Sequence, residues 1–98
     1  MKAAAPPVQE LVRVLQAMSD PHRLKMLKLL ADGEWHPCGP EVWATGLHKS
    51  TISHHMRILR EAGLVENQQH GRSKHAKLRR DAIEERFPGL LGGILPNL

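Results

Sequence analysis

Hydroxyl, imidazole and guanidinium side chains gather between residues 49 and 57 in a spacing suited to nucleic-acid recognition. Four of them fall at positions i, i+3, i+4 and i+7 of a helix and so share one face: Ser50, Ser53, His54 and Arg57. This face offers hydrogen-bond donors, acceptors and a cation, and it carries no carboxylate. Groups of this kind recognise the base edges of a DNA major groove. We therefore predict that Ser53, His54 and Arg57 contact bases.

Phosphate-binding groups flank this face. Ser50 and Thr51 place hydroxyl groups at a helix N-terminus, whose free backbone N–H groups favour an anion. Arg72 and Lys74 lie in or beside a Gly-containing turn that can reach a sugar-phosphate backbone. The predicted DNA-binding set is Lys49, Ser50, Thr51, Ser53, His54, Arg57, Arg72 and Lys74.

The charge of the chain is concentrated in the same region. The 98 residues carry a net charge of +4. Residues 49–80 hold eight of the fourteen Lys and Arg but two of the ten Asp and Glu, which leaves +6 there and −2 elsewhere. A localised basic segment indicates a polyanionic partner, and double-stranded DNA is the first candidate.

Cys38 is the single cysteine of the chain, which excludes an internal disulfide framework and favours a cytoplasmic location. Three interpretations stay open, one of which is a disulfide with Cys38 of a second copy across a dimer. As a small apolar residue it would only fill space. As a redox or thiol-reactive sensor, its thiol would have a pKa lowered by His36 and by a helix that begins just after it. Cys38 and His36 are therefore the sensor candidates.

No grouping of side chains indicates catalysis. The sequence lacks a Ser/His/Asp grouping, a phosphate-binding glycine loop and a carboxylate pair, so neither an enzyme activity nor a cofactor is predicted. His54 and His55 point about 100° apart on a helix and do not share a face, which argues against a metal site there. We expect His54 to contact DNA and His55 to be partly buried.

The elements that must position these residues follow the order helix, helix, short helix, turn, helix, hairpin. Apolar periodicity predicts a helix over about 7–18 and a short helix over about 40–44. Capping residues predict two more helices: one begins after the N-cap Asp20 and stops at Gly33, and the other begins at the N-cap Ser50 and runs to about 62. Strands are expected over 64–67 and 74–78 around a turn at 70–73, and short helices in the tail. We predict a mainly α fold with a small β-hairpin, a winged helix-turn-helix with its helix-turn-helix at 40–62 and its wing at 64–78.

Apolar side chains recur at helical spacing near both ends of the chain. They would pack within the chain or, as we predict, form a two-fold dimer interface that completes the core of so short a chain. This homodimer interface comprises Val8, Leu11, Val12, Leu15, Leu91, Ile94 and Leu95, on helices over 8–18 and 81–98. Residues 1–7 are interpreted as a frayed tail. No membrane span is expected, so a single cytoplasmic domain over 1–98 is predicted.

Two runs of residues resemble a known family. Residues 15–33, LQAMSDPHRLKMLKLLADG, resemble the opening signature of ArsR-type repressors, and residues 49–65, KSTISHHMRILREAGLV, resemble their recognition helix. With a wing-like Gly71-Arg72 turn, the resemblance covers about residues 8–80. It implies a symmetric dimer, an operator with two half-sites, and release of DNA on a signal. By position, Ser50, Thr51, Ser53, His54 and Arg57 match the family's DNA-contacting helix.

The sequence departs from this family where its metal sensors carry their ligands. The best-known metal-sensing members have Glu-Leu-Cys-Val-Cys, and the matching run here is Glu34-Trp35-His36-Pro37-Cys38. Two ligands at i and i+2 do not make a zinc site, which needs three or four. The family's second pattern, Asp and His along the C-terminal helix, is absent because Asp81 is followed by no His. No metal is predicted, and the inducing signal is left open.

Two other functions fit a winged helix. A protein-interaction module would bind duplexes without sequence preference. An RNA-binding module would need an aromatic stacking platform, and the chain has one Phe, no Tyr and two Trp that are expected to be buried. Both are weaker than the DNA-binding hypothesis, because the polar helix face, the local charge and the following hairpin coincide.

Overall fold

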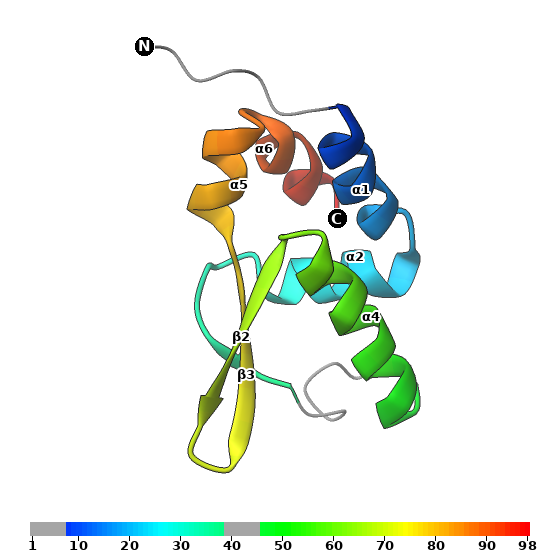
Figure 1. Ribbon diagram of the computed structural model, residues 1–98, viewed down its shortest axis with the longest axis vertical. Coiled ribbons are helices and arrows are strands. Elements are labelled where there is room, and N and C mark those ends of the chain that lie inside the picture. The colour runs from blue at the N-terminus through cyan, green and yellow to red at the C-terminus, as the bar shows by residue number, and fades with distance from the viewer. Residues whose placement is uncertain (1–7, 39–45) are drawn as a thin grey trace.

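The computed structural model describes residues 8–38 and 46–98 of the chain. Its helices are α1 (Val8–Met18), α2 (Pro21–Leu29), α4 (Lys49–Glu61), α5 (Arg80–Arg86) and α6 (Leu90–Ile94), with a 3-10 turn, η1 (Leu95–Asn97), after them (Figure 1). The strands are β1 (His36–Pro37), β2 (Val65–His70) and β3 (Ser73–Leu78). The predicted tail over 1–7 and the predicted helix over 40–44 lie outside the described residues.

Helix α2 begins at the predicted cap. The Asp20 carboxylate accepts hydrogen bonds from the backbone N–H groups of His22 (2.8 Å) and Arg23 (3.1 Å), while Pro21 occupies the first helical position. Satisfying two of the orphan amides in this way fixes where the helix starts.

Helix α4 begins earlier than predicted. Its N-cap is His48, whose carbonyl accepts from Ile52 N–H at 3.0 Å and whose side chain makes no capping hydrogen bond. Ser50 therefore lies inside the first turn, and its prediction as the N-cap is wrong. His48 has the extended backbone torsions of an N-cap (φ −64°, ψ 151°), so the helical residues begin at Lys49. A polar side chain at Ser50 could not reveal that geometry.

The small sheet has the order β1-β3-β2, with both pairings antiparallel. Pairing runs from Val65 opposite Leu78 to His70 opposite Ser73, so the hairpin is longer and its turn tighter than predicted. Gly71 at φ +63° begins the two-residue turn, a conformation that favours glycine. Strand β1 was not predicted, because two residues that include a proline show no strand alternation.

One hydrophobic core joins the helices to the sheet. Its buried apolar side chains come from α1, α2, α4, the hairpin and the C-terminal helices: Val14, Ala17, Met18, Met26, Leu27, Leu30, Ile52, Met56, Leu59, Leu64, Val65, Ala76, Leu78, Ile83 and Leu91. The inward face of α4 is formed by Ile52, Met56 and Leu59, which are all part of this core.

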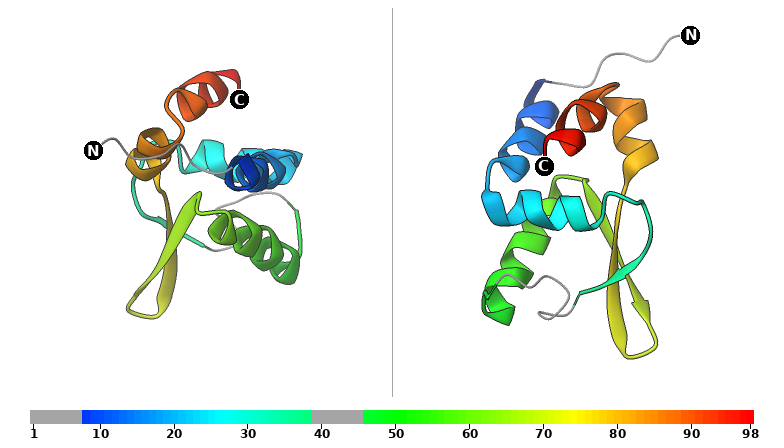
Figure 2. Two further views of the ribbon diagram at one scale, coloured as in Figure 1. Left: turned by 45° about the horizontal axis from the view of Figure 1, so that its top comes forward. Right: turned by 180° about the vertical axis from the view of Figure 1, so that it is seen from behind.

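The C-terminal segment folds back onto the same core (Figures 1 and 2). The Glu84 carboxylate accepts hydrogen bonds from the backbone N–H groups of Gly89, Leu91 and Gly92, which start α6. Leu91 is fully buried within its own chain, so its prediction as a dimer-interface residue is wrong. Ile94 and Leu95 pack partly against the core and keep some exposed surface. Among residues 8–38 and 46–98, no helix has the length and apolarity that crossing a membrane requires.

Candidate nucleic-acid interface

Helix α4 and the β2–β3 hairpin extend from the same end of the molecule. The views in Figures 1 and 2 agree that α1, α5 and α6 lie at the other end. The predicted DNA-binding residues and the predicted apolar interface are thus separated along the long axis, which extends 44 Å.

The two faces of α4 differ as predicted from its periodicity. The outward side chains of Lys49, Ser50, Ser53, His54 and Arg57 are exposed, and Thr51 is half-buried. His55 lies on the inward side and is 8% exposed. The helix therefore presents hydroxyl, imidazole and cationic groups to solvent while its apolar side fixes it to the core.

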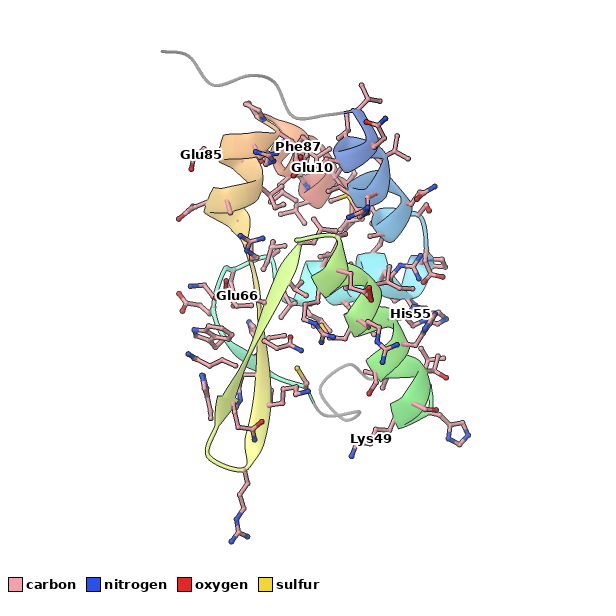
Figure 3. All side chains as sticks on the ribbon, viewed as in Figure 1. Glu10, Lys49, His55, Glu66, Glu85 and Phe87 are labelled. Atoms are coloured by element: carbon pink, nitrogen blue, oxygen red, sulfur yellow. The ribbon has the colours of Figure 1, made fainter. Side chains whose placement is uncertain are left out.

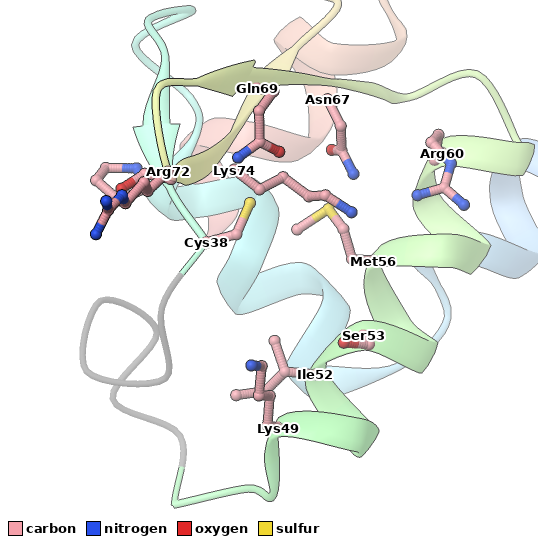
Figure 4. A pocket seen from close by; sticks show the side chains of 12 residues that line it. Cys38, Lys49, Ile52, Ser53, Met56, Arg60, Asn67, Gln69, Arg72 and Lys74 are labelled. Carbon is pink, nitrogen blue, oxygen red and sulfur yellow. The ribbon is translucent and has the colours of Figure 1, made fainter.

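The hairpin brings further cations near this helix. Arg72 is exposed at the turn, and Lys74 is exposed two residues later on β3. A groove of about 500 Å³ lies between α4 and the hairpin, as Figure 4 shows. Lys49 and Arg60 line it from α4, and Arg72 and Lys74 line it from the hairpin.

The described lining of this groove contains no carboxylate, so four cations face a space without a compensating negative charge. The lining is Pro37, Cys38, Lys49, Ile52, Ser53, Met56, Arg60, Asn67, Gln69, Arg72, Ser73 and Lys74. Such an arrangement attracts an extended anion, because the field of like charges in a concave site adds up.

Four polar lining residues were missing from the predicted DNA-binding set: Arg60, Asn67, Gln69 and Ser73. Arg60 could have been found, because it lies seven residues after Ser53 and so returns to the same side of the helix. Asn67 and Gln69 lie two residues apart on β2 and so share the face of the strand that lines the groove. The predicted strand ended at residue 67 and therefore left out Gln69.

The sensor candidates are not arranged as predicted. His36 Nε2 lies 2.8 Å from Asp32 Oδ1, and this hydrogen bond holds the pKa of Asp32 below its usual value. Burial raises the pKa of the Cys38 thiol, and the nearby Lys74 ammonium opposes this only in part. The expected lowering of the Cys38 pKa is therefore wrong: the thiol is half-buried in the groove wall and its reactive thiolate is disfavoured.

The described residues do not suit a bound metal. No three His, Cys, Asp or Glu side chains within 8–38 and 46–98 are grouped as metal ligands. His36 and Cys38 supply only two donors, and His36 already pairs with Asp32.

The apolar stripe of α1 is largely solvent-exposed. Val8 is 73% exposed, Val12 and Leu15 are each 43% exposed, and Leu11 is half-buried. The side of α1 that packs on the core is instead formed by Val14, Ala17 and Met18. Much of the surface of this stripe is thus left uncovered by the described residues of its own chain.

Comparison with known proteins connects this geometry to regulators. The sequence profile described as "bacterial regulatory protein, arsR family" matches residues 20–67, from the cap of α2 into β2. The HTH-type transcriptional regulator YceK of Bacillus subtilis (strain 168) is 34% identical over 80 residues, which cover 81% of this chain and 80% of YceK. The transcriptional repressor SdpR of the same strain is 30% identical over 81 residues, covering 83% of this chain and 89% of SdpR.

Solved structures share the architecture. The homodimeric winged helix-turn-helix DNA-binding domain of Mb0332 from Mycobacterium bovis superposes with a TM-score of 0.71 at 25% identity, covering 92% of this chain and 81% of that one. The predicted fold class, a mainly helical winged helix-turn-helix with a small antiparallel sheet, is therefore confirmed.

Proposed function

The chain belongs to the ArsR family of bacterial regulatory proteins, and on this premise we propose that it is a homodimeric repressor of transcription that binds a palindromic operator in double-stranded DNA. The observation that carries the proposal is the outer face of α4 over residues 49–57, which carries no carboxylate and lies beside a groove lined by four cations. Members of this family are transcriptional regulators and not enzymes, which agrees with the lack of a catalytic grouping in the sequence.

In the proposed complex α4 lies in a major groove. Ser53, His54 and Arg57 contact base edges, because they are exposed and lie on one side of the helix. Lys49, Ser50 and Thr51 approach a phosphate from the first turn of α4, whose amides have no side-chain cap.

The groove between α4 and the hairpin accommodates the adjoining DNA strand. A sugar-phosphate backbone separates the major groove from the neighbouring minor groove, and α4 and the wing contact the two sides of that strand. Lys74 and Arg60 face it from opposite walls, and Arg72 extends toward the minor groove from the turn. Arg60 is thereby added to the proposed DNA-binding set.

A second copy of the chain is proposed to cover the exposed stripe of α1. A palindromic operator presents two equivalent half-sites, and a two-fold dimer places one α4 on each. Val8, Leu11, Val12 and Leu15 supply the apolar contact, joined by the exposed parts of Ile94 and Leu95. This stripe lies at the end of the molecule opposite α4, so a dimer formed there leaves the DNA-binding face of α4 free (Figure 1).

The proposed signal that releases this repressor from DNA is a redox change of the Cys38 thiol. The position of Cys38 in the groove wall supports it, because an adduct there would obstruct the space proposed for DNA. The raised pKa of the thiol opposes it. In the alternative, the Cys38 side chain has only a packing role between α4 and the hairpin.

The decisive experiment is fluorescence anisotropy with a labelled duplex of the DNA upstream of the encoding gene, measured across a salt series. Selective binding that weakens steeply with salt supports the proposal, because neutralised phosphates release counterions. Weak and equal binding to all duplexes would favour a protein-interaction module. Stronger competition by single-stranded RNA than by duplex DNA would favour an RNA-binding module.

A further inference from the structure

A buried imidazole on α4 is joined to two other helices through one arginine. His55 Nδ1 lies 3.1 Å from Arg23 Nη1, and Figure 3 shows His55 on the side of α4 away from the hairpin. The same guanidinium donates from Nε to the Ala17 carbonyl (2.6 Å) and from Nη2 to the Gln16 carbonyl (3.4 Å). Arg23, near the start of α2, therefore connects the C-terminal end of α1 with the inner side of α4.

The chemistry of the two groups fixes the protonation state of His55. A guanidinium stays protonated and has only donors, so His55 Nδ1 must be the acceptor. The ring is then neutral and carries its proton on Nε2. Protonation of Nδ1 would remove the acceptor and place two cations in contact.

The surroundings of His55 favour this neutral form. Burial lowers its pKa below the ordinary 6.5, and Arg23, His22 and His54 act in the same direction, whereas Asp20 opposes them. The rings of His22 and His54 each lie 5.7 Å from that of His55. Helix α1 contributes the backbone carbonyls of Gln16 and Ala17, which accept hydrogen bonds from Arg23.

We propose that Arg23 and His55 are positioning residues for DNA recognition, which hold α4 in register with the C-terminal end of α1 through a neutral imidazole. Since α1 is the proposed dimer helix, this link sets the orientation of each recognition helix relative to the two-fold axis. The inference rests on the proposed function. It adds that operator binding requires His55 to be unprotonated.

The chain offers a matched pair of substitutions at His55. His55→Asn places an amide oxygen close to the position of Nδ1 and does not titrate, so it keeps an acceptor for Arg23. His55→Gln is closer to histidine in volume, but its amide lies near the position of Nε2 and misses Arg23. A packing role would favour the Gln variant, whereas the proposed role favours the Asn variant.

The test is anisotropy of the upstream duplex with the wild-type chain and both variants as the pH falls from about 7.5 to about 5.5. We expect the affinity of the wild type to fall about tenfold relative to His55→Asn, the effect of losing one hydrogen bond to a charged group. The comparison cancels the charge that other histidines gain in both proteins. His55→Gln should bind weakly even at the higher pH. Arg23→Lys should also bind weakly, because it keeps the charge but lacks the planar guanidinium whose Nε, Nη1 and Nη2 reach three separate acceptors.

Thermal unfolding of the free proteins over the same pH range gives a readout without DNA. The wild type should lose stability below pH 6.5 more steeply than His55→Asn, because the unfolded state takes up the proton first. Parallel pH profiles of wild type and His55→Asn in unfolding, or equal behaviour of the Asn and Gln variants, would overturn the inference. Failure of every protein to select a duplex would instead reject the proposed function, and the unfolding profiles would still decide on the Arg23–His55 link.

Discussion

Arg86 on α5 donates two hydrogen bonds of 2.5 Å to the carboxylate of Glu10 on α1, and so ties together residues 76 positions apart. This bidentate pair joins the beginning of the chain to its C-terminal segment at the end of the molecule that carries the exposed apolar stripe. It lowers the pKa of Glu10, mainly through the hydrogen bonds from Arg86, and raises that of Arg86.

The Glu10–Arg86 pair should make stability depend on acid. Because the pKa of Glu10 is lowered in the folded state, the contribution of the pair is complete above pH 4.5 and is lost as the pH falls through the lowered value. Glu10→Gln should reduce the melting temperature slightly at neutral pH and flatten its decline in acid. Exchanging the partners in Glu10→Arg/Arg86→Glu should restore the loss, as thermal unfolding at low and high salt can show. Identical acid profiles of wild type and Glu10→Gln would contradict a role for the pair in stability.

Arg57 should carry sequence discrimination. Arg57→Ala removes the guanidinium from the outer face of α4 and should reduce the preference for the operator over a scrambled duplex by about 1–3 kcal/mol. Competition anisotropy measures this preference directly. Arg13→Ala, on the distant α1, is the control for loss of one positive charge. An unchanged preference in Arg57→Ala would remove this residue from the base-contacting set.

The wing should contribute affinity rather than selectivity. Arg72→Ala at the hairpin turn should weaken binding to every duplex by a similar factor and reduce the slope of log affinity against log salt by about 1. Arg60→Ala should do the same if this side chain faces a phosphate in the groove. A change in operator preference in either variant would instead indicate a direct contact with a base.

Cys38 should react slowly. Because burial raises the pKa of the Cys38 thiol, the reactive thiolate is disfavoured at neutral pH. We expect slow alkylation by iodoacetamide in the folded chain and normal operator binding by Cys38→Ser. Rapid alkylation, together with oxidant-induced release of DNA that Cys38→Ser abolishes, would establish the thiol as a sensor.

The α1 stripe should control assembly. Leu15→Glu introduces a charge on the exposed stripe and should shift the chain toward monomers in sedimentation experiments, with a parallel loss of operator affinity. Leu29→Glu on α2 is a matched control, because both side chains are 43% exposed. Equal sedimentation of wild type and Leu15→Glu would place the dimer contact elsewhere or reject it.

The sequence by itself determined the features that depend on local chemistry. The Asp20-Pro21 start of α2 and the division of α4 into an apolar and a polar side follow from capping and from a period of 3.6 residues. The same information identified the polar face at Ser53, His54 and Arg57. The side of a helix on which a surface residue lies can be predicted from its position in the sequence, because the 3.6-residue repeat fixes the direction of each side chain.

Only the tertiary structure decided what depends on residues distant in the chain. The pairing of β1 with β3, the burial of Leu91, and the bond of Arg23 to His55 join segments whose separation carries no periodic signal. Helix α6 forms despite two glycines because Glu84 binds three of its first amides and the core covers Leu91. Likewise, the pKa of Cys38 rises because packing removes water from the thiol, which residue type and neighbouring sequence could not indicate.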